Sequence, residues 1–261
     1  MIFADFPRQI GSMPKMTRAG QAYWRAMMDV MRQLLPEPAT ETTVQDAYAR
    51  PLGQHADQPW VSLSMIASVD GSTVVDGNSG ALSSPTDSAV LVQLRRIADV
   101  ILVGAGTVRG EGYGPPSKQG QRVGVVTARG EVDMTTPLFT SGAGFIITTV
   151  DGALEGSGDI DVLRAGHGRV DLAAAIKRIP ELCPDTTVVQ AEGGAALNGA
   201  LLDADVLDEL NITTSPVTVG GSGPRISARA ADHRNRFDLA QLTLDEHSFV
   251  YSRWLRRRAG S

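Results

Sequence analysis

An alternation of apolar runs with amphipathic segments, from Trp60 to about residue 205, restricts the fold of this chain more than any other feature. Short apolar or alternating runs predict strands, and apolar residues at spacings of three and four predict helices. The predicted strands lie at 61–70, 99–103, 122–127, 144–149, 160–163 and 186–191. Helices are predicted at 84–98, from about 104, at 171–180 and around 197–202. Strands that alternate with helices form largely parallel sheets, so we expect an α/β sandwich.

The chain after residue 205 has a different pattern. Strand-like stretches occur at 207–214, 217–219, 237–244 and 247–254, and no helical spacing separates them. Strands without helical crossovers pair in antiparallel fashion. We therefore expect a largely parallel mixed sheet with antiparallel strands at its C-terminal end, in one domain that spans residues 60–261.

The first 59 residues are predicted to lie outside that domain. Residues 1–16 contain two prolines and a glycine and are interpreted as a leader, and residues 36–59, with four prolines, as a connecting arm. Between them, an amphipathic helix is predicted at 17–35 and ends at Pro36. Its apolar residues recur at spacings of three and four: Trp24, Met27, Met28, Met31, Leu34 and Leu35. We interpret this stripe as core or subunit contact in preference to a cofactor site.

The composition excludes several classes of partner. The chain carries 29 acidic and 24 basic residues, a net charge of −5, so it offers phosphodiester backbones no general attraction. No apolar run approaches the ~20 residues that span a bilayer, and the N-terminus lacks the basic start of a secretion signal. We expect a cytoplasmic protein with a small-molecule substrate and with neither a nucleic-acid nor a membrane partner.

The isolated histidine, cysteine and C-terminal arginine residues predict no special site. Cys183 is the single cysteine, and the four histidines have no ligand spacing with it or with one another. We therefore expect no metal site. The arginines at 253 and 256–258 are interpreted as a solvated basic tail.

Two glycine clusters, each directly after an apolar strand, carry the most chemistry. Gly104, Ala105, Gly106 and Thr107 follow the first strand and begin a helix, an arrangement that lets backbone N–H groups approach a phosphate. The third glycine of a dinucleotide fingerprint is missing, because Arg109 stands there, so a tight turn without a ligand is the alternative.

The second cluster consists of Glu192, Gly193 and Gly194 and follows the strand at 186–191. It repeats the same device and adds a carboxylate at the strand end. Two such loops in one sheet favour a dinucleotide over a mononucleotide.

The first strand has one face that the core does not need. Its odd positions from 61 to 69 are apolar, and its even positions include Ser64, Ser68 and Asp70. A carboxylate on that polar face can accept a hydrogen bond from a heterocycle or relay a proton. The alternative is an aspartate that caps the turn before Gly71.

Several of these segments occur in the order found in a known family. They are Ser68–Gly71, Val103–Val108, Glu192–Gly194, Leu207–Leu210 and Pro216–Gly221. From Trp60 to Trp254, the chain resembles the reductase domain of bacterial riboflavin biosynthesis, the C-terminal part of the bifunctional deaminase-reductase. The stretch Thr107–Gly114 is similar to an actinobacterial branch of that family.

The resemblance implies a fold, a reaction and a coenzyme. It implies a dihydrofolate-reductase-like three-layer sandwich, a homodimer, and NADPH as hydride donor. The implied reaction is the reduction of a ribosylamino-pyrimidine phosphate, of the 5-amino-6-(5-phosphoribosylamino)uracil type, to a ribityl compound. The sequence lacks the histidine and cysteine signature of the zinc deaminases, so the deaminase step is expected in another protein.

The resemblance also assigns roles by matching position. Asp70 and Glu192 match catalytic positions, with Asp70 expected to handle the proton. Substrate contacts are expected from Ser64, Ser68, Asp70 and Arg109. Thr127 and Arg129 match the position of the adenosine 2′-phosphate, although a solvated turn arginine is the alternative. The expected coenzyme loops contain Gly104, Ala105, Gly106, Thr107, Glu192, Gly193 and Gly194.

The chain departs from the family at two positions. Ser64 stands where these reductases usually carry a lysine, and Ser88 stands where a phosphate-binding arginine is usual. Arg95, Arg96 and Arg109 are possible replacements, although Arg95 and Arg96 are interpreted as solvated helix residues. The alternatives are a reductase of another heterocycle, such as a pterin or dihydrofolate, and a dinucleotide-binding dimer without turnover. The choice among NADPH, NADH and a deazaflavin also stays open.

Overall fold

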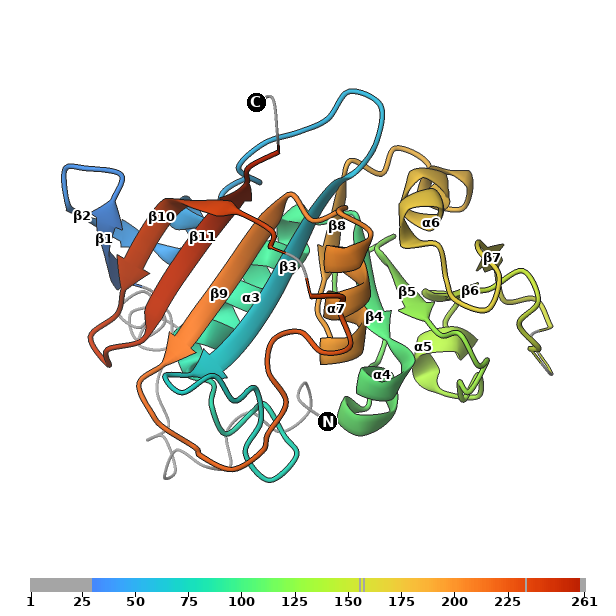
Figure 1. The fold of residues 1–261 in the computed structure, drawn as a ribbon. Coiled ribbons are helices and arrows are strands. Elements are labelled where there is room, and N and C mark those ends of the chain that lie inside the picture. Colours follow the sequence, from blue (N-terminus) through green and yellow to red (C-terminus); the bar gives the residue numbers. More distant parts are fainter. Residues whose placement is uncertain (1–29, 155, 157, 233, 259–261) are drawn as a thin grey trace, which may run out of the picture.

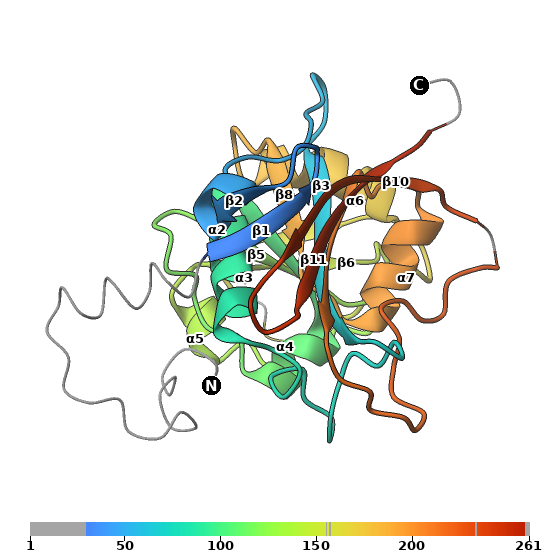
Figure 2. The same cartoon turned by 90° about the vertical axis from the view of Figure 1, so that its left-hand side faces the viewer.

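The structure is a computed structural model that describes residues 30–154, 156, 158–232 and 234–258. Within these residues the strands form one mixed sheet of 11 strands, in the order β2-β1-β10-β11-β9-β3-β8-β4-β5-β6-β7. Helices cover both faces of the sheet, so the molecule has three layers (Figures 1 and 2). The predicted α/β sandwich is confirmed.

The larger part of the sheet is parallel. Its strands are β9 (Glu209–Ser215), β3 (Trp60–Ser68), β8 (Val188–Ala191), β4 (Val100–Gly104), β5 (Arg122–Val126), β6 (Gly144–Thr148) and β7 (Val162–Arg164). Beyond β9 the pairing is antiparallel, in β11 (Val250–Arg256), β10 (Phe237–Leu244), β1 (Val30–Leu35) and β2 (Thr40–Thr43). The antiparallel C-terminal strands β10 and β11 were predicted, whereas β9 also pairs in parallel with β3.

The helices divide between the two faces of the sheet (Figure 2). One face carries α2 (Val44–Ala47), α3 (Pro85–Ile97), α4 (Ala105–Glu111) and α5 (Pro137–Thr140). The other carries α6 (Leu172–Arg178) and α7 (Ala195–Asp203). The short 3₁₀ helix η1 (Ile179–Glu181) directly follows α6 in the chain. Helices α6 and α7 pack in one apolar cluster with β3 residues Val61 and Leu63. The even positions of β3 face α3, where Ser62 Oγ donates to Gln190.

Helix α3 begins as its sequence predicts. Ser84 Oγ accepts a hydrogen bond from Asp87 N at 3.1 Å, and Pro85 occupies the first helical position. Val90 and Leu94 are buried and pack against the antiparallel part of the sheet. The helix is therefore held by its cap and by one apolar stripe.

The helix predicted up to Leu35 is wrong for the part that the structure describes. Residues Val30–Leu35 form β1, which pairs with β10 on one side and β2 on the other. Met31 is buried in the α2–α3 cluster, and ladder pairing over six residues outweighs the helical spacing. Residues 17–29 lie outside the described part. The arm at 36–59 contributes β2 and α2, so β1 and β2 extend the same sheet and α2 packs beside α3.

The strand predicted at 217–219 is also wrong. These residues form a loop after β9, and Val69 N donates to Val217 O at 2.9 Å. The N–H of Val219 donates to the side chain of Asp70 and not to a neighbouring strand. A side-chain acceptor has replaced the ladder here.

The parallel strands β3, β8, β4 and β5 end at the same edge of the sheet. Both glycine clusters, Asp70 and Thr127 directly follow those ends. In an α/β sheet this edge is where ligands bind, because the loops there come from several strands.

Candidate active site

The two glycine bends lie side by side. Gly104 N donates to Gly193 O at 2.8 Å. A Cβ atom on Gly104 would lie 3.5 Å from Gly194 N, and one on Gly194 would lie 2.8 Å from Thr107 Oγ1. Gly193 has a φ of +92°, which favours glycine, and the Gly193–Gly194 peptide bond is cis. The bends predicted from separate parts of the sequence thus form one continuous backbone surface.

The loop after β5 lies beside the first bend, because Val126 pairs with Gly104. Thr127 is buried, and its Oγ1 accepts a hydrogen bond from Gly130 N at 3.1 Å. Arg129 is exposed on the same loop. Thr127 therefore shapes the turn, and Arg129 is the side chain that a ligand at this edge can reach.

Glu192, the carboxylate at the end of β8, is held from the α3 side. Arg95 Nε donates to Glu192 Oε1 at 2.7 Å, and Arg95 Nη2 donates to Oε2. Tyr113 Oη also donates to Oε2, at 2.7 Å. The Glu192 side chain is 3% exposed and that of Arg95 is 16% exposed. Burial raises the pKa of Tyr113 well above its ordinary value, so its phenol keeps the proton that it donates.

The interpretation of Arg95 as a solvated helix residue is therefore wrong. Two of its guanidinium nitrogens, Nε and Nη2, donate to the two carboxylate oxygens of Glu192, and its Cζ lies 5.6 Å from the centre of the Tyr113 ring. The partners are far apart in the sequence, so helical spacing gave no sign of this buried pair. Arg96, one position further, is exposed as expected.

A cavity of about 510 Å³ lies between α3 and the segment that follows α4. Its walls combine apolar groups such as Ile101 with polar side chains: Arg95, Arg96, Glu111, Tyr113, Lys118 and Gln121. Arg95 and Tyr113 therefore stand between this cavity and the glycine bend that Glu192 begins. A volume of this size accommodates a heterocycle with a polar substituent.

Glu111 is a carboxylic acid in the cavity wall whose pKa is raised. Burial raises its pKa above the ordinary carboxyl value, and the nearby charge of Glu192 adds to that effect. Ser79 Oγ donates to Glu111 Oε1 at 3.2 Å. A cavity carboxyl with a raised pKa is suited to hold and deliver a proton.

Asp70 occupies a different environment at the end of β3. It is exposed, and its carboxylate accepts from Ser68 Oγ, from Val219 N and, at 2.7 Å, from Gly220 N. These hydrogen bonds lower its pKa to about 2, led by the one from Ser68. Such a group is ionised near neutrality, which favours a positional role over proton donation.

The other expected substrate residues are dispersed. Ser64 is half-buried on the α3 side of β3, opposite Asn211. Ser68 Oγ accepts from Ser72 N at 2.9 Å while it donates to Asp70. Arg109 lies on the exposed side of α4 and donates to the Glu131 carbonyl, so it is not among the residues that line the cavity.

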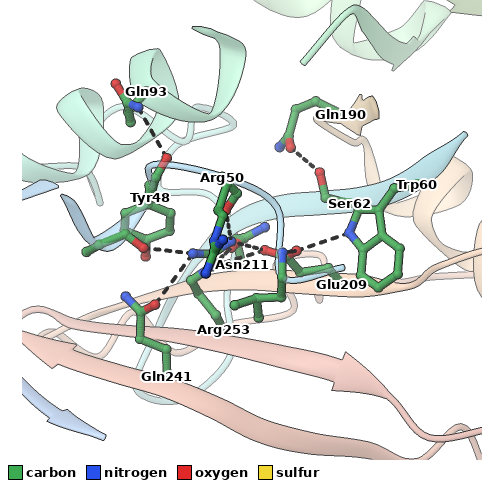
Figure 3. A network of polar contacts seen from close by, with 12 residues as sticks. Tyr48, Arg50, Trp60, Ser62, Gln93, Gln190, Glu209, Asn211, Gln241 and Arg253 are labelled. Carbon is green, nitrogen blue, oxygen red and sulfur yellow. Dashed lines mark hydrogen bonds and ion pairs between the residues drawn. The ribbon is translucent and has the colours of Figure 1, made fainter. Parts of the chain in front are cut away.

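A second polar network lies under α2 and α3, in the antiparallel part of the sheet (Figure 3). Arg253 Nη2 donates to Glu209 Oε1 at 2.7 Å, and its guanidinium also donates to the carbonyls of Ala47 and Arg50. Glu209 Oε2 accepts from Leu52 N and from the indole of Trp60. The expectation that Arg253 belongs to a solvated tail is therefore wrong, because it is 2% exposed and ties the arm to the sheet.

In the described ranges, no group of three or more His, Cys, Asp or Glu residues could hold a metal ion. No helix in the same part of the chain is long and apolar enough to cross a membrane.

Sequence reasoning missed Glu111, Tyr113, Lys118 and the role of Arg95. Tyr113 lies in the stretch Thr107–Gly114, which was singled out by its resemblance and not by its chemistry. Lys118 donates to the Ala98 carbonyl at 2.6 Å, at the cavity wall. No local pattern marks either residue, because the cavity forms only when α3 packs against the segment after α4.

Comparison with known proteins identifies the family to which the chain belongs. The model of the RibD C-terminal domain family matches residues 59–251, which is more than half of the chain. The chain belongs to this family, as the order of its motifs predicted.

Particular relatives are consistent with this assignment. The 2,5-diamino-6-ribosylamino-4(3H)-pyrimidinone 5′-phosphate reductase of Methanothermobacter thermautotrophicus is 26% identical over 183 residues, which covers 64% of this chain and 82% of that protein. A pyrimidine reductase-like protein of Corynebacterium diphtheriae has a TM-score of 0.69 at 22% identity, covering 82% and 98% of the two chains. The riboflavin biosynthesis reductase of Saccharomyces cerevisiae has a TM-score of 0.62 at 20% identity, covering 82% and 97%. These two structures share its fold.

Proposed function

We propose that this chain reduces a ribosylamino-pyrimidine phosphate with NADPH, as a step of riboflavin biosynthesis. The observation that carries the proposal is the joined pair of glycine bends at the carboxyl edge of the sheet, with Gly104 N bonded to Gly193 O. Family membership and the named activity of the M. thermautotrophicus relative support the reaction class.

The residues at this edge fit a dinucleotide. Backbone approach is close where side chains are absent, and a Cβ atom on Gly106 would meet nothing within 4 Å outside its own helix, so the surface of the bend is open at this position. The first-turn N–H groups of α4 are the donors we assign to the pyrophosphate. The exposed Arg129 is the candidate for the 2′-phosphate, which would favour NADPH over NADH.

In the proposed mechanism the coenzyme, when bound, supplies the hydride. Glu192, which Arg95 and Tyr113 hold in place, acts as a hydrogen-bond acceptor that orients donor groups near the Gly193–Gly194 bend. Glu111, in the adjoining cavity, holds the proton that the reduced product takes up. We therefore place the substrate in the cavity, with its opened sugar carbon toward the coenzyme.

The cavity also offers cations for the substrate phosphate. Ser64 and Ser88 are neutral, and Arg109 is bound to the Glu131 carbonyl. Arg96 and Lys118 both line the cavity, so we assign the phosphate to them. The homodimer that the resemblance implies stays a prediction, as does the cytoplasmic location expected from the composition.

NADPH oxidation followed at 340 nm tests the function. Turnover with the ribosylamino-pyrimidine phosphate and none with dihydrofolate is the expected result. Turnover with dihydrofolate alone would favour a pterin-type reductase. NADPH binding without turnover of either compound would favour a non-catalytic dinucleotide-binding dimer.

Replacing Asp70 with Asn should lower turnover by more than about tenfold and leave NADPH affinity within about twofold. The neutral amide weakens the hold on Val219 and Gly220, in the loop after β9, a strand that runs parallel to β3 and ends at the same edge of the sheet. Because the folded pKa is lowered, this hold is complete above about pH 4 and is lost as the pH falls through about 2. Steady-state kinetics at pH 7 check the effect, and wild-type turnover in the variant would remove Asp70 from the site.

A further inference from the structure

We infer that Arg95 and Tyr113 are positioning residues that, through Glu192, hold the Gly193–Gly194 bend in the shape that accepts the coenzyme. The inference rests on the proposed function, because it concerns the coenzyme loop of that site. It assigns a purpose to a buried ion pair and a phenol that belong to neither glycine cluster.

The bend needs an external restraint. Glycines in tandem have more backbone freedom than any other pair of residues, so an isolated Gly193–Gly194 segment would sample many conformations. Coenzyme binding would then have to order the segment, which lowers affinity. A bend that is already ordered binds more tightly.

The structure supplies the restraint from two sides. On one side, Gly104 N donates to Gly193 O and so ties the bend to the first glycine cluster. On the other side, the residue directly before the bend, Glu192, is fixed by its side chain to α3 and to the segment after α4. A backbone contact therefore restrains the bend at Gly193, and side-chain contacts restrain the residue directly before it.

The geometry at Glu192 suits this purpose. The Arg95 guanidinium contacts both carboxylate oxygens, a planar fork that a lysine cannot reproduce. Tyr113 donates a third hydrogen bond, to Oε2. This contact restricts rotation of the carboxylate group about the bond that joins it to the rest of the Glu192 side chain. With the side chains of Glu192 and Arg95 only 3% and 16% exposed, water competes weakly for these contacts.

The clamp on Glu192, formed by the side chains of Arg95 and Tyr113, also faces the cavity. Arg95 and Tyr113 both line it, so a ligand there touches the same side chains that hold the coenzyme bend. A substrate in the cavity would thus contact Arg95 and Tyr113, and the coenzyme would contact the bend that these two residues hold through Glu192.

A double-mutant cycle on NADPH affinity, measured by calorimetry, tests the inference. Tyr113→Phe keeps the ring and removes one hydrogen bond, and we expect it to weaken NADPH binding about fivefold. Glu192→Gln removes the charge, and we expect about tenfold or more. In the double variant, Tyr113→Phe should have almost no further effect, because it acts through the Glu192 carboxylate.

Two further variants separate positioning from general stability. Tyr251→Phe removes the hydrogen bond of another buried phenol, to Asp245 at 2.8 Å in the α2–α3 layer. We expect it to lower Tm and to leave NADPH affinity unchanged. Arg95→Lys keeps the charge and should still weaken NADPH binding severalfold.

Three outcomes would contradict the inference. If the wild type binds NADPH and the Tyr113→Phe variant binds it with the same affinity, the inference is overturned and the proposed function is not. Effects of Tyr113→Phe and Glu192→Gln that multiply would show that they act independently, and would also overturn it. A wild type that binds no NADPH would overturn the proposed function, and the inference with it.

Discussion

Replacing Glu111 with Gln should lower kcat by a factor between about 10² and 10⁴, the usual contribution of a general acid. The amide has nearly the same shape as the carboxyl group and has no acidic proton to deliver. Glu111 lines the cavity, and its pKa is raised by burial and by the charge of Glu192. The substrate KM should change little, because the polar contact from Ser79 is preserved in kind.

The pH profile distinguishes this role from a structural one. Because the folded pKa of Glu111 is raised, its protonated form persists above the ordinary carboxyl range. Wild-type kcat should therefore fall as the pH rises through that pKa, and the Gln variant should lack this fall. The variant should also be at least as stable as the wild type at high pH, because ionising a buried carboxyl destabilises the fold. A wild-type kcat in Glu111→Gln would exclude Glu111 as the proton donor.

The second large effect concerns stability. Replacing Arg253 with Met should reduce the free energy of unfolding by about 3–5 kcal/mol, the cost of leaving one partner of a buried ion pair uncompensated. Glu209, which is 0% exposed, would keep only the donors from Leu52 and Trp60. The carbonyls of Ala47 and Arg50 would also lose their donor, so the arm should detach first.

Urea unfolding measures this effect against two controls. Arg257→Met breaks a pair with Asp238 in which both side chains are nearly half exposed, and should change stability by less than about 1 kcal/mol. Adding Glu209→Gln to Arg253→Met should recover part of the loss, because no unpaired charge stays buried. Equal effects of Arg253→Met and Arg257→Met would show that the network in Figure 3 does not hold the arm.

The parts of the fold that local pattern specifies were predictable. The strand and helix alternation from Trp60 onward, the Ser84 cap and the antiparallel C-terminal strands all follow from nearby residues. The two glycine clusters were also found, because each directly follows a buried strand. Their contact through Gly104 and Gly193 follows once β4 and β8 are neighbours.

The remainder depends on contacts between distant segments. Arg95 lies 97 residues from Glu192, and Arg253 lies 44 residues from Glu209, so neither buried pair leaves a local signal. Met31 fits a helical stripe and a strand equally well, and only pairing with β10 and β2 decides for the strand. Charged residues on a helix or near a terminus are usually solvated. Arg95 and Arg253 are exceptions because each forms an ion pair with a buried carboxylate.

Calorimetric titration of NADPH into wild type, Gly106→Asp and Gly106→Asn tests the central claim most directly. A Cβ atom at Gly106 would have no atom within 4 Å outside its chain neighbours and the helix's own backbone, and an acid in the first turn of a helix does not destabilise it. If the joined glycine bends hold the pyrophosphate, the wild type binds one NADPH per chain, the Asp variant loses binding by charge repulsion, and the isosteric Asn variant binds far better than Asp. Equal NADPH affinity in the Asp and Asn variants, or no binding heat with the wild type, would contradict the account.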